Sequence, residues 1–179
     1  RSAPKSTTGS SMMSIKLAGK AADSIVDGAG MRYTLFAQGC PHHCLGCQNP
    51  ATHDFEGGVN VEAETILAEI LENPLLRGIT FSGGEPFCQA APLAALAREV
   101  HAHGLDVWVY TGYTLETLEN MHDEGIAALL GETDVLVDGD YREGERDLTL
   151  PFRGSRNQRL IDMKKTREKH ALVLWEEAR

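Results

Sequence analysis

Five short runs of apolar residues recur along the chain, each between stretches that are richer in polar residues. The runs lie at 33–37, 79–81, 105–110, 134–137 and 171–175. They are rich in β-branched and aromatic residues, and each of the first four is followed by a loop that contains glycine. Because such runs bounded by turn residues are typical of strands, we predict five short β-strands.

Helical patterns fill the spaces between these runs. Three stretches carry apolar residues every three or four positions: 66–71, 93–100 and 115–118. The first two predict amphipathic helices that end at Asn73 and near Gly104, and the third predicts a helix that Gly125 can interrupt. Ser155 followed by Gln158 fits a capping box, which predicts the start of a fourth helix.

The alternation of strands and helices predicts an α/β fold with a mainly parallel sheet, because parallel neighbours need helical crossovers. About five to six strands are too few for a closed eight-stranded barrel, so we expect an open, partial β/α barrel or a doubly wound sheet. One domain is expected over 12–179, and the small, polar segment 1–11 is interpreted as a disordered leader or an expression-tag remnant. The loops after the first four runs should meet at one edge of the sheet.

The composition of the 179-residue chain narrows the class of protein. Asp and Glu number 26 against 17 Lys and Arg, which gives a net charge of −9 and argues against a nucleic-acid-binding protein. Apolar residues make up 42% of the chain, but no run approaches the ~20 residues needed to cross a membrane. Segment 1–11 lacks the apolar stretch of a secretory signal, so we expect a cytoplasmic protein with reduced cysteines.

Three of the four cysteines lie close together, in the pattern Cys40-x3-Cys44-x2-Cys47. A loop of this size can wrap three thiolates around one soft metal centre. A cubane iron–sulfur cluster usually takes four cysteines, so three would leave one iron open to a small molecule. The remaining cysteine, Cys88, is interpreted as a small buried residue rather than as a fourth ligand or a nucleophile.

Other chemistry fits the same spacing. A zinc site would combine the three cysteines with a histidine, and His42, His43 and His53 are close in sequence. A redox disulfide would need only two of the thiols, and three buried thiols can also meet without a function. The spacing alone therefore favours an iron–sulfur cluster, with zinc as the main alternative.

Several motifs together resemble those of known enzymes. The cysteine loop after one strand and Gly-Gly-Glu-Pro at 83–86 after the next resemble the radical S-adenosylmethionine (SAM) enzymes. Asp-Gly-Ala-Gly-Met-Arg at 27–32 resembles the activases of glycyl radical enzymes. Five further segments are similar to the activases of anaerobic ribonucleoside-triphosphate reductases: 47–50, 52–55, 110–113, 135–139 and 152–159. The resemblance covers about 14–175.

The resemblance implies a partial barrel of the radical SAM type and an oxidoreductase similar to the activase of formate C-acetyltransferase. It implies a [4Fe–4S] cluster on Cys40, Cys44 and Cys47, with SAM bound at the iron that these cysteines leave free. Reductive cleavage of SAM would give a 5′-deoxyadenosyl radical, which takes a hydrogen atom from a glycine of the reductase catalytic subunit. A flavodoxin-type protein is the electron donor that the resemblance implies.

The resemblance also assigns residues to the cofactor and to the protein substrate. Candidate SAM-binding residues lie in the cysteine loop and in the later strand-end loops: Gly46, Cys47, Gln48, Gly83, Gly84, Glu85, Thr111 and Asp138. Candidate contacts with the protein substrate lie before the first strand and near the C-terminus: Asp27, Gly28, Gly30, Arg32 and Arg153. Both assignments have a purely structural alternative. Asp138 could cap a turn with Gly139, and 27–32 could be a tight turn followed by a solvated arginine.

Two rival functions stay open on the sequence alone. One is activation of another glycyl radical enzyme, or a radical SAM reaction on a small molecule. The other is a zinc-binding interaction module without enzymatic activity.

Overall fold

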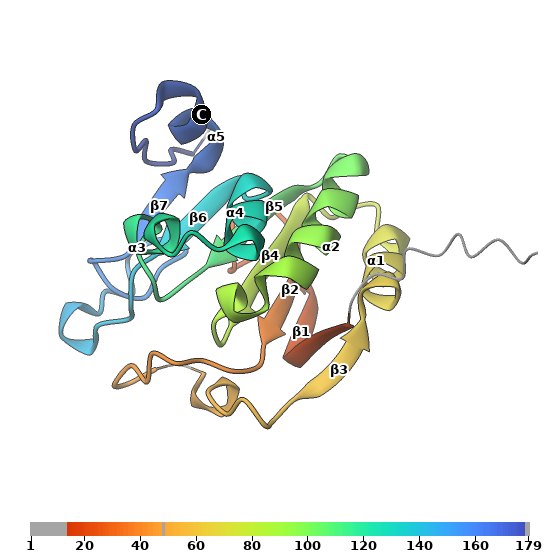
Figure 1. Cartoon of the computed structure of the whole chain (residues 1–179), viewed down its shortest axis with the longest axis horizontal. Helices are drawn as coiled ribbons and strands as arrows, with labels where there is room; N and C mark the ends of the chain where they lie inside the picture. Colours follow the sequence, from red (N-terminus) through yellow and green to blue (C-terminus); the bar gives the residue numbers. More distant parts are fainter. Residues whose placement is uncertain (1–13, 48, 178–179) are drawn as a thin grey trace, which may run out of the picture.

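The apolar runs of the sequence form the centre of a seven-stranded sheet in the computed structural model, which describes residues 14–47 and 49–177. From one edge to the other the strands are β3 (Val59–Glu62), β1 (Ser14–Ser24), β2 (Arg32–Ala37), β4 (Gly78–Gly83), β5 (Asp106–Tyr110), β6 (Val135–Asp138) and β7 (Arg159–Asp162). Figure 1 shows the sheet with helices packed across one face. The expected leader at 1–11 and Gln48 lie outside the described residues.

The sheet is open and belongs to an α/β fold, as expected, but it is mixed rather than mainly parallel. Strands β2, β4, β5 and β6 are parallel to one another. The outer pairs β3–β1, β1–β2 and β6–β7 are antiparallel. Most side chains of β1 and β3 are at least partly exposed, so these strands lack the apolar run that marks a buried strand.

Two predictions near the C-terminus are wrong. The run at 171–175 forms only an isolated bridge between Leu174 and Ile161. No helix begins at Ser155, because its hydroxyl accepts a hydrogen bond from the Arg142 amide instead of capping a helix. The chain continues into β7, and α5 (Met163–Lys169) starts where Asp162 accepts a hydrogen bond from the amide of Lys165.

The helices predicted before that point are confirmed, and they cover one face of the sheet. They are α1 (Ala63–Glu72), α2 (Ala90–Ala102), α3 (Leu115–Asn120) and α4 (Glu124–Gly131). Their apolar sides bury Ile66, Leu93 and Leu129 in one continuous core with the strands. The third helical stretch does break, but at 121–123, where Asp123 caps α4 through the amide of Ile126. Gly125 lies inside α4.

Alternate residues of the central strands point to the opposite face, which carries a second, smaller apolar cluster. Trp108 packs edge-to-face against Phe152 and Trp175, with ring centroids 5.3 and 5.1 Å apart. Phe152 and Trp175 come from segments with no regular secondary structure, so these segments cover part of this face where helices are absent. The part of this sheet face that these segments leave uncovered lies next to the candidate functional site.

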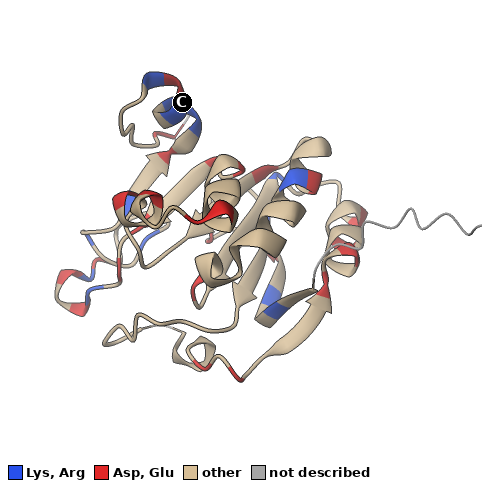
Figure 2. Cartoon of the chain, viewed as in Figure 1, with Lys and Arg blue, Asp and Glu red and all other residues tan. Residues whose placement is uncertain are grey.

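The carboxyl ends of β2, β4, β5 and β6 lie at the same edge of the sheet, as Figure 1 shows. The loops that follow them bring together residues far apart in sequence. Figure 2 shows that Lys and Arg gather on α5, away from the cysteine loop. Within the part of the chain that the structure describes, no helix is long and apolar enough to cross a membrane.

Candidate functional site

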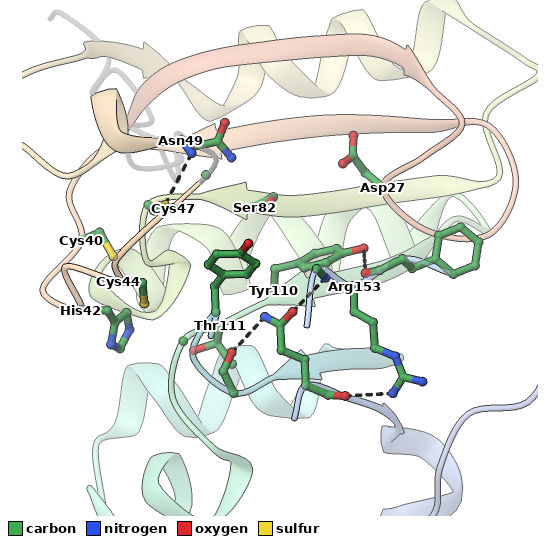
Figure 3. Close-up of a pocket in the computed structure, with 18 of the residues that line it drawn as sticks. Asp27, Cys40, His42, Cys44, Cys47, Asn49, Ser82, Tyr110, Thr111 and Arg153 are labelled. Carbon is green, nitrogen blue, oxygen red and sulfur yellow. Dashed lines mark hydrogen bonds between the residues drawn. The ribbon is translucent and has the colours of Figure 1, made fainter. Parts of the chain in front are cut away.

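A cavity of about 620 Å³ lies at the carboxyl ends of the central strands. All three clustered cysteines line it, together with the loops after β4, β5 and β6. Figure 3 shows Cys40 and Cys44 at one end of the cavity, Tyr110 and Ser82 in its middle, and Asp27 toward the other end. Its volume is within the range of pockets that hold cofactor-sized ligands.

Backbone hydrogen bonds join the start of the cysteine loop to its end. Gly39 donates to the carbonyl of Thr52 at 2.6 Å, and Cys40 donates to the carbonyl of His53 at 3.2 Å. The amide of Cys47 donates to the Cys44 carbonyl, which closes a tight turn between these two cysteines. The loop therefore leaves β2 and returns beside its own start, with the thiols on the cavity side.

Each of the three sulfur atoms receives a backbone N–H. The amide of His42 donates to Cys40, that of Tyr141 donates to Cys44, and that of Asn49 donates to Cys47 at 3.4 Å. Tyr141 comes from the loop after β6, so a distant segment contacts the cysteine loop. Hydrogen bonds to cysteine sulfurs set the reduction potentials of iron–sulfur clusters.

The thiols are not prepared to act as free nucleophiles. Burial raises the pKa of Cys40 and of Cys44 above the ordinary value, although a backbone N–H donates to each. Reactive cysteines have lowered pKa values in electropositive surroundings, whereas a bound metal deprotonates a coordinating thiol directly. These two thiols therefore suit metal ligation better than a redox disulfide.

The donor set fits a [4Fe–4S] cluster with one open iron. Cys88 does not line the cavity, so three cysteines are present there and a fourth is not. No three His, Cys, Asp or Glu side chains among residues 14–47 and 49–177 are arranged to hold a single metal ion. A zinc ion needs its ligands to converge on one point, whereas a cubane cluster binds each thiolate at a different iron.

The prediction that Cys88 is buried is wrong. Its side chain is exposed at the end of the short 3₁₀ turn Pro86–Gln89. Partial burial against the protein and the nearby Glu85 carboxylate raise the pKa of Cys88 to about 11, so this thiol stays protonated at neutral pH.

Glu85 connects the cysteine loop to the ends of β4 and β5. Its side chain is 0% exposed, and one carboxylate oxygen accepts from His42 Nε2, the Thr111 hydroxyl and the Gly112 amide at 2.6–2.9 Å. The other oxygen accepts from the amide of Phe87 and caps the turn that precedes α2. A buried carboxylate that is saturated in this way braces the loops.

Gly83 and Gly84 lie so close to the backbone of residues 36–39 that a side chain has no room at either position. A Cβ at Gly84 would lie 2.4 Å from the carbonyl oxygen of Gly39, and one at Gly83 would lie 2.6 Å from the amide of Ala37. Both glycines line the cavity, so their exposed backbone is open to a bound ligand.

The remaining candidate cofactor residues occupy different places. Thr111 lines the cavity while its hydroxyl donates to Glu85. Asp138 faces the helix side: it accepts from the Leu115 amide at 2.8 Å and pairs with Arg159 through both oxygens. The carboxylate thus contacts the first residue of α3 and the Arg159 guanidinium, and it does not line the cavity. Gly46 lies beside the Glu143 carboxylate and is not among the lining residues.

Arg32 corrects the expectation for the 27–32 segment. It is 0% exposed and therefore neither solvated nor able to touch a protein substrate. Its guanidinium pairs with Asp106 at 2.5 Å, donates to Thr80, and lies 5.4 Å from the centre of the Trp108 ring. Burial lowers the pKa of Arg32, while the Asp106 carboxylate acts in the opposite direction.

The glycines that precede Arg32 leave room for two arginine side chains. A Cβ at Gly28 would lie 2.7 Å from the Arg32 side chain, and one at Gly30 would lie 2.6 Å from that of Arg77. Asp27 lines the cavity and accepts from Ser24 Oγ at 2.5 Å. Arg153 also lines the cavity, but in Figure 3 its guanidinium points away from the cysteines toward the carbonyl oxygen of Gln158.

Sequence reasoning missed several contributors to the cavity. Among them are the amide of Tyr141, the Tyr110 ring, Ile25 and Val26, and the mainly apolar segment 148–152. Burial raises the pKa of Tyr110, whose hydroxyl donates to the carbonyl of Phe152 at 2.6 Å. Tyr110 follows Trp108 by two residues on a central strand, so period-2 alternation could have placed both on the cavity face.

Comparisons with known proteins agree with this site. A family model described as a 4Fe-4S single cluster domain matches residues 26–161. The anaerobic ribonucleoside-triphosphate reductase-activating protein of Vibrio cholerae is 38% identical over 143 residues, which are 75% of this chain and 89% of that protein. The protein of that name from Escherichia coli is 37% identical over 142 residues, which are 75% of this chain and 90% of that protein. Among solved structures, QueE from E. coli superposes with a TM-score of 0.42 and 18% identity over 57% of this chain and 53% of that chain.

Proposed function

Since the chain belongs to the 4Fe-4S single cluster domain family and to the anaerobic ribonucleoside-triphosphate reductase-activating proteins, we propose that it generates a glycyl radical on such a reductase. The expectation of a [4Fe–4S] cluster is confirmed by the family match. The substrate in this proposal is the catalytic subunit of the reductase, and the second cofactor is SAM.

One observation carries the proposal. Three cysteines line one end of a cavity of about 620 Å³, and the fourth cysteine of the chain lies outside it. A cluster held there keeps one iron without a protein ligand, and the rest of the cavity is large enough for a cofactor-sized molecule.

The residues of the chain then have separate tasks. Cys40, Cys44 and Cys47 hold the cluster, and the N–H donors to their sulfurs stabilise negative charge on it. When bound, cluster and SAM supply the one-electron cleavage that yields a 5′-deoxyadenosyl radical, which takes a hydrogen atom from a glycine Cα. The bare backbone of Gly83 and Gly84 lets a ligand approach the end of β4.

Two apolar regions of the protein border the cavity in which the radical would form. The ends of β4 and β5 line it through Ser82, Gly83 and Tyr110, and the helix-side core behind these strands is buried. Phe152 lines the cavity and packs on Trp108, so the smaller apolar cluster also borders it.

The electron donor and the compartment follow from the proposed chemistry. Cleavage of SAM needs one electron from outside the chain, and we propose a flavodoxin-type donor. An oxygen-sensitive cluster and free thiols need a reducing compartment, so we place the protein in the cytoplasm.

The proposal is tested with protein reconstituted without oxygen, reduced, and mixed with SAM and the reductase catalytic subunit. We expect 5′-deoxyadenosine and a glycyl radical signal in electron paramagnetic resonance. Cys44→Ala should abolish both, whereas the matched variant Cys88→Ala should keep both. Formation of 5′-deoxyadenosine without a radical on the reductase would point to another glycyl radical enzyme or a small-molecule substrate. If a fully loaded, reduced cluster formed no 5′-deoxyadenosine, the radical SAM chemistry would be refuted.

A further inference from the structure

Three strongly exposed apolar side chains stand around the mouth of the cavity. Ile25 and Val26 are each 71% exposed, and Leu148 is 76% exposed. All three line the cavity, although they come from two segments more than a hundred residues apart in sequence. Single exposed apolar residues are common, but a group of them at the rim of one cavity marks an interaction site.

Both segments are fixed to the sheet behind them. The turn that carries Ile25 and Val26 is held by Asp27, which accepts from Ser24 Oγ through its side chain and from Thr80 Oγ1 at 2.7 Å through its carbonyl. The tips are therefore presented by an anchored turn, so little conformational entropy is lost when they bind a partner.

Leu148 stands near the tip of a short hairpin-like flap. An isolated bridge joins Arg146 and Ser155 at the base of the flap, with backbone hydrogen bonds of 3.2 and 2.9 Å on either side. Phe152 anchors the returning arm, because its ring packs on Trp108 and its carbonyl accepts from a tyrosine hydroxyl. The flap thus holds Leu148 across the mouth from the β1–β2 turn.

Under the proposed function, a segment of the reductase must pass between the β1–β2 turn and the flap that carries Leu148. A hydrogen atom can be taken from a glycine only if that glycine enters the cavity, because the three cysteines proposed to hold the cluster line the cavity. Glycine has no side chain and contributes little apolar contact, so neighbouring residues must supply the binding energy. The tips carry no charge on a chain with a net charge of −9, which suits apolar neighbours.

We propose that Ile25, Val26 and Leu148 form an apolar lip that binds apolar side chains flanking the target glycine of the reductase. This inference rests on the proposed function. The occupant is an extended segment of the reductase catalytic subunit, with its glycine inside the cavity and its neighbours against the lip.

The test compares the double variant Ile25→Ser/Val26→Ser and the single variant Leu148→Ser with wild type. Leu75→Ser is the matched control, because Leu75 is 72% exposed but does not line the cavity. Two reactions are measured on the cluster-loaded protein: SAM cleavage without reductase, and glycyl radical formation against reductase concentration. Substitutions at such exposed positions leave the fold intact.

We expect each lip variant to raise the KM for the reductase about tenfold, which corresponds to the loss of about one buried aliphatic contact. SAM cleavage without reductase should keep its rate and its KM for SAM, and Leu75→Ser should match wild type in both reactions. Unchanged KM values for the reductase in both lip variants would overturn the lip while leaving the proposed function in place.

Two other results would also overturn the lip. A higher KM for SAM in the reaction without reductase would assign these side chains to the cofactor. A change in oligomeric state, measured by light scattering, that accounts for the loss of activity would assign them to contacts between copies of this chain. Failure of wild type to form any glycyl radical would instead refute the proposed function itself.

Discussion

Replacing His42 by alanine should loosen the cysteine loop without unfolding the protein. The imidazole lies between the buried Glu85 carboxylate, 2.6 Å from Nε2, and the ring of Tyr113, whose centre is 4.4 Å away. The backbone amide of the same residue donates to the Cys40 sulfur. The side chain of His42 therefore fixes the residue whose amide donates to Cys40, the first of the proposed cluster ligands.

The magnitude follows from the carboxylate partner. A hydrogen bond to a charged, buried group contributes about 1.5–3 kcal/mol, so the variant should lose about 2 kcal/mol of local stability. A loss of this size makes the loop open about 30 times more often. If it also enters the free energy of global unfolding, the urea midpoint falls by about 1 M, because m is about 2 kcal/mol/M for small proteins.

The assay measures the rate at which an iron chelator removes the cluster from reconstituted protein, together with urea unfolding of the metal-free chain. Cluster loss should be about 30 times faster in His42→Ala than in wild type. His42→Gln keeps an N–H donor within reach of Glu85 and should recover part of the difference. His43→Asn is the matched control, since His43 is exposed in the same loop and its φ of +50° suits asparagine.

Equal rates of cluster loss in His42→Ala and His43→Asn would refute this account of the loop. The same conclusion would follow if His42→Ala lost cluster faster but His42→Gln showed no recovery. A midpoint potential unchanged in His42→Ala would show that the N–H donor to Cys40 stays in place without the side chain.

Three further predictions concern the frame around the site. Arg32→Met removes the buried guanidinium that pairs with Asp106 and leaves that carboxylate beside the more distant Arg77, 3.6 Å away, so it should lower the free energy of unfolding by about 3 kcal/mol in urea titrations. Gly84→Ala places a Cβ 2.4 Å from a backbone oxygen, and it should cost about 1–3 kcal/mol and reduce iron incorporation measured by absorbance. Burial acts to lower the pKa of His101, but hydrogen bonds to Asp134 and Glu132 outweigh it and raise the pKa above 6.5. The raised pKa stabilises the fold by about 1 kcal/mol or less, because this group is partly exposed. This stabilisation is present below pH 6.5 and is lost as pH rises through the raised pKa. His101→Gln should therefore remove this pH-dependent part of the free energy of unfolding, measured by urea titrations at several pH values.

The sequence by itself determined the central strands, the first helices and the position of the cysteine loop, whose spacing favoured an iron–sulfur cluster over zinc. These features are local: apolar runs, helical stripes and the spacing of three thiols are written in neighbouring residues. The edge strands β1 and β3 escaped prediction because exposed strands need few apolar residues. The polar loops at 83–85 and 111–112 were placed at the site because parallel strands end at one edge.

Only the tertiary structure decided what the polar side chains do there. Arg32 looked like a surface group until its burial against Trp108 and Asp106 was seen, and Asp138 turned out to face α3 rather than the cavity. The support of Cys44 by a backbone amide of the loop after β6, and the apolar lip, join segments about a hundred residues apart. Hydrogen-bond partners and cavity walls depend on distances in space. The pattern of apolar and polar residues along the chain does not show which distant segments come into contact.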